Sequence, residues 1–299
     1  MSNASTPLLE LRDVTKIFGG GGMLSQQQTV ALKSFSYAVQ TDPPTITAVV
    51  GESGSGKSTM ANLMLGLESP TEGSVRYRGT DLHKASRQER RTFRREVQAI
   101  FQDPYGVYNS FYKVDHVLST PIAKFKMASS RAQEEEMIDR ALRQVGLKPE
   151  ETLGRYPHQL SGGQRQRIMI ARTLLLRPKI IVADEPVSMV DASLRLTILT
   201  NLLQLKEQYG ISLVYITHDL ATAYQISDHI LVLHRGVVVE EGTPDQVVKH
   251  PQHEYTRLLI GSIPIADPNR TWGDGLDERS GSTDDRAPQQ NSILLQDGQ

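Results

Sequence analysis

The 299-residue sequence contains no cysteine and no long apolar run. Without cysteine there are no disulfides, cysteine-ligated zinc sites or iron–sulfur clusters. No stretch of about 18 apolar residues, which a membrane span needs, is found, and residues 1–5 lack the basic start of a secretory signal. The formal net charge of -1 argues against a dedicated nucleic-acid binder. These absences predict a protein of the cell interior and leave a peripheral membrane partner open.

The order of apolar stretches predicts an α/β fold with a helical insert. Strands are expected at residues 8–18, 46–50, 73–82, 180–183 and 212–217, and helices at 57–66, 192–209 and 220–226. Residues 103–176 show helical spacing, with a capping box at Ser130–Gln133 and a glycine stop at Gly146. Arg235-Gly236 lies between two short β stretches and predicts a hairpin. From residue 266 onward the polar, Gly- and Pro-containing composition predicts a disordered tail.

A glycine-rich loop follows the strand expected at 46–50. It matches the pattern G-x-x-x-x-G-K-[ST], in the strand–loop–helix context that this pattern requires. Glycines let backbone N–H groups converge on phosphate oxygens, the helix N-terminus adds a positive dipole, and Lys57 brings a full charge. The plain alternative is a glycine turn that binds nothing. The loop predicts a nucleoside triphosphate site made by Gly51, Ser53, Gly54, Ser55, Gly56, Lys57, Ser58 and Thr59.

Two carboxylates end the apolar strand expected at 180–183. Asp184 is suited to hold Mg²⁺ through water, together with the hydroxyl of Ser58. Glu185 is suited to polarise an attacking water. A solvated strand end is the plain alternative, because many strands end in acidic residues. Beside a phosphate loop, the pair predicts hydrolysis of a Mg²⁺-bound nucleotide.

A second anion site opens the helix that follows Leu160. Ser161 stands at the N-cap position, and Gly162 and Gly163 permit close backbone approach before Gln164. This site has no lysine of its own. One chain seldom has use for two such sites on one γ-phosphate.

These motifs together resemble the ATP-binding cassette (ABC) ATPases, whose signature is Leu-Ser-Gly-Gly-Gln. The resemblance implies that Ser161, Gly162, Gly163 and Gln164 bind the γ-phosphate of ATP held by another subunit. It also implies that two ATPase domains close around ATP.

Four further positions match this family in order. Gln102 matches the Q-loop glutamine that touches Mg²⁺, and His218 matches the switch histidine that assists hydrolysis beside Glu185. Asp191 matches the D-loop, although Met189 and Val190 depart from its usual Ala-Leu. Phe18 matches the aromatic residue that stacks on adenine; a core phenylalanine is the alternative.

The resemblance covers about residues 8–265. It implies a RecA-like P-loop core with an antiparallel β subdomain and an α-helical insert at about 103–176, within a nucleotide-binding domain of residues 1–265 that precedes the tail of 266–299. Phe101–Tyr105 and the sequence Tyr-Thr-Arg-Leu-Leu from Tyr255 are similar to the ATPase subunits of oligopeptide/dipeptide importers, a subfamily that also serves oligosaccharides and nickel. The implied function is that of an importer's motor, which uses ATP and Mg²⁺ as a peripheral protein on the cytoplasmic face of the cell membrane.

The implied partners are a second ATPase subunit, transmembrane permease subunits and an extracytoplasmic substrate-binding protein, with no nucleic acid. A groove near residues 102–111 is expected to receive a short helix of the permease. Whether the second ATPase is this chain or a paralogue stays open, as does peptide against oligosaccharide cargo. The contrasting hypothesis is an ABC ATPase acting on ribosomes or DNA. A single cassette without sustained heptads disfavours it, and export is disfavoured because no membrane helices are fused to the cassette.

Overall fold

Two β-sheets and a group of helices form the described part of the chain, which in this computed structural model comprises residues 6–19, 28–39, 41–101, 108–188 and 192–262. The strands are β1 Leu9–Phe18, β2 Thr29–Val39, β3 Ile46–Val50, β4 Glu72–Tyr77, β5 Thr80–Asp81, β6 Val97–Ile100, β7 Ile180–Asp184, β8 Ser212–Thr217, β9 His229–His234 and β10 Val237–Gly242. The helices are α1 Lys57–Met64, α2 Arg87–Glu96, α4 Val114–Phe125, α5 Arg131–Gln144, α6 Pro149–Thr152, α7 Gly162–Leu175, α8 Ala192–Tyr209, α9 Leu220–Ile226, α10 Pro244–Lys249 and α11 Glu254–Gly261.

The larger sheet has the strand order β10-β9-β3-β8-β7-β6. Its strands β6, β7, β8, β3 and β9 pair in parallel, and β10 joins the edge antiparallel to β9. β3 and β8 are buried at every position. Burial on both faces explains why these strands are continuous apolar runs in the sequence.

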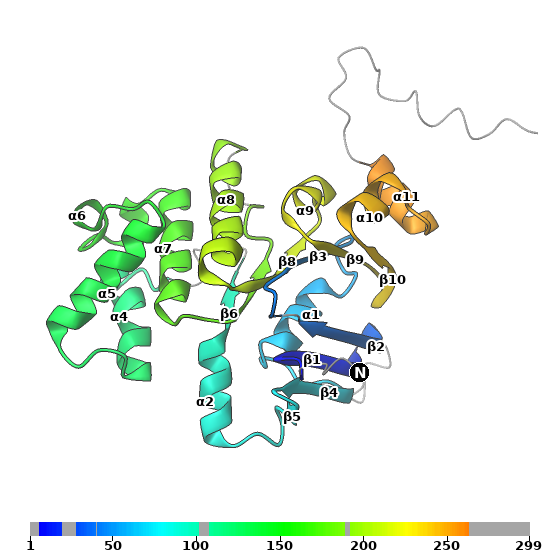
Figure 1. Ribbon diagram of the computed structural model, residues 1–299, viewed down its shortest axis with the longest axis horizontal. Coiled ribbons are helices and arrows are strands. Elements are labelled where there is room, and N and C mark those ends of the chain that lie inside the picture. The colour runs from blue at the N-terminus through cyan, green and yellow to red at the C-terminus, as the bar shows by residue number, and fades with distance from the viewer. Residues whose placement is uncertain (1–5, 20–27, 40, 102–107, 189–191, 263–299) are drawn as a thin grey trace, which may run out of the picture. The chain divides into compact units, whose positions relative to one another are not determined.

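Alternate residues of these strands enter two hydrophobic clusters. Val49, Val182 and Val214 face a cluster that includes α1 and β1, while Ala48, Ala183 and Tyr215 face one that includes α7, α8 and α9. Helix α1 therefore lies between the larger sheet and the antiparallel sheet, whose order is β2-β1-β4-β5 (Figure 1). The α/β class predicted from the sequence, with an antiparallel subdomain, is confirmed.

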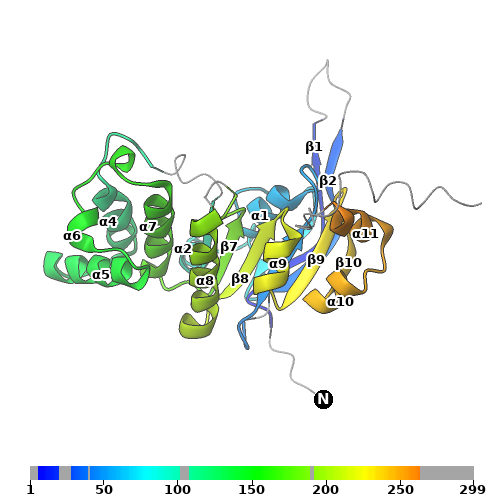
Figure 2. The same cartoon turned by 90° about the horizontal axis from the view of Figure 1, so that it is seen from above.

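The helical insert is formed by α4, α5, α6 and α7, which lie together to one side of the larger sheet (Figure 2). The capping expected at the start of α5 is only half right. The Ser130 hydroxyl accepts the Gln133 N–H at 3.2 Å, but the Gln133 side chain accepts the N–H of Ser129, so the reciprocal bond goes one residue upstream. Helix α7 carries Ser161 at its N-cap and packs against both α4 and α5.

The described residues between 6 and 262 all belong to one compact unit, and residues 263–299 lie outside the described ranges. The predicted domain boundary at 265 and the predicted tail of 266–299 therefore stay predictions. Within the described ranges, no helix combines the length and the apolar character that crossing a bilayer requires.

Two leucines of α8 offer a test of this packing. Leu202 is fully buried, whereas Leu196 on the same helix is 67% exposed. We expect Leu202→Ala to lower the free energy of unfolding by about 3 kcal/mol, because it removes buried methyl groups and leaves a cavity. Leu196→Ala should change it by less than about 0.5 kcal/mol. Denaturant titration of both variants measures the difference, and equal losses would contradict the placement of α8.

Candidate functional site

The predicted catalytic residues gather at one edge of the larger sheet. Gly51 follows β3, Glu185 follows β7 and His218 follows β8. Because these three strands run in parallel, their carboxyl ends meet at the same edge, where open α/β sheets bind ligands. The sheet topology thus joins motifs that are far apart in the sequence.

The phosphate loop packs closely against the backbones of β9 and β2. A Cβ added at Gly51 would lie 2.2 Å from the Leu233 carbonyl oxygen of β9, and one added at Gly56 would lie 2.4 Å from the Ala31 carbonyl oxygen of β2. These two positions therefore require glycine. Inside the loop, the buried Ser55 hydroxyl has no hydrogen-bond partner among the described residues. An unsatisfied hydroxyl in a loop of converging amides fits a site that a polar ligand completes.

Lys57 is buried against its own loop. Its side-chain amine donates to the carbonyl oxygens of Gly51 at 2.6 Å and Glu52 at 2.7 Å. Burial lowers the pKa of Lys57, while the nearby Glu185 and Asp184 carboxylates oppose this shift. A cation that is largely withdrawn from water and held by neutral carbonyls is suited to receive an anionic phosphate.

Ser58 and Asp184 form an oxygen-rich pair beside this lysine. Burial raises the pKa of Asp184, and a hydrogen bond with the Ser58 side chain opposes the rise. A hydroxyl and a carboxylate are hard oxygen ligands of the kind Mg²⁺ takes together with phosphates and water. The described residues contain no cluster of three or more His, Asp or Glu side chains that could cage a metal alone. The pair fits an ion brought in with a nucleotide.

Glu185 is fixed in an uncommon backbone conformation. Its φ of +46° lies in the left-handed region, which costs energy for a residue with a Cβ. The Glu185 N–H donates to the Ile216 carbonyl of β8 at 2.9 Å, and its own carbonyl accepts from the Ser188 hydroxyl at 3.0 Å. The backbone of the strained residue is thereby held at both of its polar groups.

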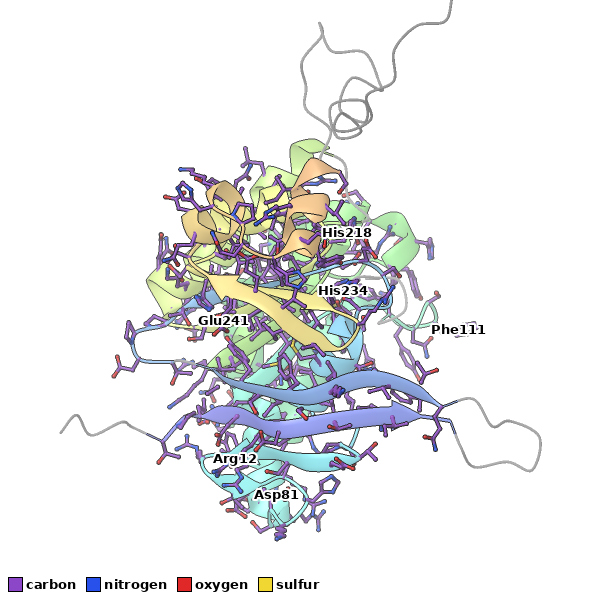
Figure 3. The ribbon with its side chains drawn as sticks, turned by 90° about the vertical axis from the view of Figure 1, so that its right-hand side faces the viewer. Arg12, Asp81, Phe111, His218, His234 and Glu241 are labelled. Carbon is purple, nitrogen blue, oxygen red and sulfur yellow. The ribbon has the colours of Figure 1, made fainter. Side chains whose placement is uncertain are left out.

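His218 reaches the same carboxylate. Its Nδ1 lies 3.1 Å from Oε1 of Glu185. The Glu185 side chain is 18% exposed and that of His218 is 60% exposed. The carboxylate is therefore largely shielded from solvent, whereas the imidazole is accessible to it. Figure 3 labels His218 above the antiparallel sheet, on which Arg12 and Asp81 lie. The carboxylate and the imidazole thus form a hydrogen-bonded pair at the ends of β7 and β8.

The predicted signature residues lie elsewhere. The Ser161 hydroxyl accepts the Gln164 N–H at 3.2 Å, and the Gln164 side chain accepts the Ser161 N–H at 2.9 Å, which makes a full capping box. A Cβ on Gly162 would meet only a side-chain atom at 4.0 Å, so space remains open there, whereas Gly163 is buried. Figures 1 and 2 both show α7 among the insert helices, separated from α1. The structure does not bring this motif to the phosphate loop of its own chain.

The remaining predicted residues divide into two groups. Phe18 ends β1 and is 40% exposed, and the Lys16 amine lies 4.8 Å from its ring centroid while pairing with Glu68. An exposed ring is available for stacking, which disfavours the alternative of a core phenylalanine. Gln102 and Asp191, with the departures Met189 and Val190, lie outside the described residues.

One contact of the phosphate loop is not indicated by any sequence motif. The N–H of Glu52 donates to the Tyr255 hydroxyl of α11 at 2.9 Å, across 203 residues of sequence. In the sequence, Tyr255 stands out only as part of the Tyr-Thr-Arg-Leu-Leu segment near the C-terminus. No periodicity or spacing connects these two positions, so only the fold reveals the contact.

Comparison with known families gives two matches. The family described as "ABC transporter" matches residues 33–188, and that described as "Oligopeptide/dipeptide transporter, C-terminal region" matches residues 239–289. The first match contains the phosphate loop, the signature and the two carboxylates. The second contains Tyr255.

Characterised relatives and solved structures agree with these matches. The chain is 39% identical to the di/tripeptide transport ATP-binding protein DppF of Pseudomonas aeruginosa strain UCBPP-PA14, over 88% of this chain and 81% of that protein. It is 40% identical to the dipeptide transport ATP-binding protein DppF of Escherichia coli K12, over 88% and 78% of the two chains. The dimeric ATP-binding cassette MJ0796 bound to ADP and Pi superimposes with a TM-score of 0.68 at 30% identity, covering 79% and 98%. CbiO1 of Clostridium perfringens, part of a cbiONQ ABC transporter complex, gives 0.69 at 25% identity, covering 82% and 92%.

A pair of glycines tests the tight packing behind the loop. Gly236 and Gly210 both have a left-handed φ, but a Cβ on Gly236 would lie 2.7 Å from the Ala31 carbonyl oxygen, whereas one on Gly210 would meet nothing within 4 Å. Both alanine variants share the backbone strain. We expect Gly236→Ala to cost about 1–3 kcal/mol more than Gly210→Ala, because it adds an overpacked contact. Thermal unfolding of the two variants decides this, and equal costs would contradict the close approach.

Proposed function

Because this chain belongs to the ABC transporter family, as an ATP-binding subunit of its oligopeptide/dipeptide branch, we propose that it hydrolyses Mg²⁺-ATP to power the uptake of di- or oligopeptides. The observation that carries this proposal is the meeting of Lys57, Asp184, Glu185 and His218 at one sheet edge. The names of the relatives support peptide as the cargo. Oligosaccharide is the alternative cargo predicted from the sequence, and the relatives' names favour peptide over it.

Binding begins with the buried lysine. Phosphate oxygens replace the carbonyls of Gly51 and Glu52 as acceptors for Lys57, and the loop amides together with the N-terminus of α1 add further donors. Ser58 and Asp184 would hold Mg²⁺, which neutralises charge on the phosphate oxygens when bound. The exposed ring of Phe18 stacks on the adenine.

Hydrolysis uses the pair at the end of β7 and β8. Glu185 orients the attacking water and accepts its proton, since its backbone is held by the Ile216 carbonyl of β8 and by the Ser188 hydroxyl. His218, already 3.1 Å from that carboxylate, orients it and contacts the γ-phosphate. By the motifs that their sequence positions match, Gln102 would help to hold Mg²⁺ and Asp191 would lie near the nucleotide at the interface between the two ATPase domains.

Two ATPase domains complete each site. Ser161, Gly162, Gly163 and Gln164 lie apart from the phosphate loop of their own chain, which supports their contact with ATP on a partner. The partner is a second copy of this chain or a paralogue. The dimeric arrangement reported for the structurally similar cassette MJ0796 supports such pairing.

The membrane partners follow from the same family. Phe111 is 89% exposed and Tyr112 is 50% exposed, just before α4, at the end of the stretch where a permease helix is expected to dock. Apolar rings exposed at a defined place are typical of a protein contact. We place the chain on the cytoplasmic face of the cell membrane, bound to permease subunits that receive cargo from an extracytoplasmic binding protein. Co-purification with the permease subunits tests this assembly.

Removal of the buried amine tests the phosphate site. We expect Lys57→Ala to abolish measurable ATP binding, because the loop then lacks the only full positive charge predicted to reach the β- and γ-phosphates. Lys249→Ala, which removes an exposed amine paired with Asp245, is the control and should bind normally. Fluorescent-nucleotide titration measures both. Normal affinity in Lys57→Ala would refute the assignment.

Neutralisation of the carboxylate tests the catalytic step. We expect Glu185→Gln to keep ATP affinity but lose turnover by roughly 10²–10⁴-fold, because the amide cannot accept a proton from water. Glu150→Gln, an exposed change in α6, serves as the control. Steady-state phosphate release measures turnover. A Glu185→Gln enzyme with near-normal activity would remove Glu185 from its proposed role.

A further inference from the structure

One peptide group of the phosphate loop is held at both of its polar ends. The carbonyl oxygen of Gly51 accepts from the Lys57 amine at 2.6 Å, and the N–H of Glu52 donates to the Tyr255 hydroxyl at 2.9 Å. These two groups belong to the same planar peptide unit. The orientation of this plane is therefore set by Lys57 on one side and by the C-terminal helix α11 on the other.

Tyr255 is itself held in place by rigid neighbours. Its ring is 7% exposed and packs against the His234 ring, with the centroids 3.9 Å apart and the planes tilted by 35°. The Nδ1 of His253 accepts the N–H of Tyr255 at 3.1 Å and caps α11. The Glu240 carboxylate of β10 accepts the N–H groups of Gln252 at 2.8 Å and His253 at 3.0 Å. The Tyr255 hydroxyl is therefore positioned by the ring contact with His234, by the cap of α11 and by the carboxylate of β10. A side chain held in this way can fix the loop that it contacts.

The β9–β10 hairpin, which supports Tyr255, also contacts the phosphate loop directly. His234 ends β9 at the turn of the hairpin, and Figure 3 labels it there, with Glu241 at the opposite end. At the turn, the Gly236 N–H donates to the Ser55 carbonyl at 2.8 Å. The hairpin thus contacts the phosphate loop directly and also supports the tyrosine that contacts it.

We propose that Tyr255 is a positioning residue for ATP binding, which keeps the Gly51–Glu52 peptide from rotating when Lys57 leaves it for the phosphates. At that moment the Gly51 carbonyl loses the charged donor that holds it. If the plane rotated freely, this carbonyl could turn toward the phosphate oxygens and repel them. The bond from the Glu52 N–H to the Tyr255 hydroxyl opposes this rotation, because it fixes the other polar end of the same peptide plane.

This assignment rests on the proposed ATP site and adds to it a role for the C-terminal region. Burial raises the pKa of Tyr255, so its hydroxyl stays neutral at physiological pH and can accept the N–H of Glu52. Because binding equilibria are reciprocal, ATP should in turn strengthen the docking of α11. The family region that distinguishes oligopeptide/dipeptide ATPases, residues 239–289, then contributes directly to nucleotide affinity.

The test removes one oxygen atom. Tyr255→Phe keeps the ring and its contact with the His234 ring but leaves the Glu52 N–H without its acceptor. We expect ATP affinity to fall about five-fold, as for the loss of one neutral hydrogen bond, with KM raised and kcat at saturating ATP nearly unchanged. The matched control is Tyr224→Phe, which removes a hydroxyl bonded to Asp245 at 2.7 Å between α9 and α10, away from the loop. Its ATP affinity should equal that of the unsubstituted protein.

Two results would overturn the proposal. One is a Tyr255→Phe protein that binds ATP with unchanged affinity, and the other is an equal loss in Tyr224→Phe. Should Tyr255→Phe fail to fold, residue-resolved hydrogen exchange of the unsubstituted protein decides instead. The Glu52 amide is expected to be protected without nucleotide, and exchange at the rate of an open loop would contradict the bond. If the unsubstituted protein binds no ATP at all, the proposed function fails rather than this inference.

Discussion

The placement of the Lys57 amine dominates the energetics of the site. A buried ammonium is stabilised only in part by the carbonyls of Gly51 and Glu52, and burial lowers its pKa. The loop around it has little freedom, since Gly51 and Gly56 meet the backbones of β9 and β2 at distances that exclude a side chain. The protein thus holds a cation in a phosphate loop that has little freedom to move. In the proposed function, a polyphosphate supplies the negative charge that this loop lacks.

The larger sheet places the other residues of the candidate catalytic site next to this loop. Parallel pairing brings the ends of β3, β7 and β8 to one edge, so the lysine, the two carboxylates and His218 meet without any long loop. The strain at Glu185 is maintained by its hydrogen bonds to β8 and Ser188. The signature serine caps α7 in the helical insert and does not reach this edge in its own chain. In the proposed function, each chain supplies the phosphate loop of one ATP site and the serine-capped helix of another.

Much of this arrangement was predictable from the sequence, for a physical reason. The strands β3, β7 and β8 are buried on both faces, so their apolar runs are unmistakable, and each ends at a motif with its own chemistry. Helix α2 was missed because only Phe93 of its ten residues is buried, which leaves no apolar periodicity to detect. Strand β2 was missed because its burial is irregular. The contact between Tyr255 and Glu52 could not be predicted, since it depends on how the β9–β10 hairpin brings α11 to the loop.

The central claim is that ATP joins the phosphate loop of one chain to the serine-capped helix of another. Sedimentation of the Glu185→Gln protein, with and without Mg²⁺-ATP, tests it most directly. We expect a monomer without nucleotide and a dimer with it, either alone or with the paralogous ATPase subunit, and we expect Ser161→Arg to prevent the association. A protein that binds ATP yet stays monomeric in both mixtures would contradict the account.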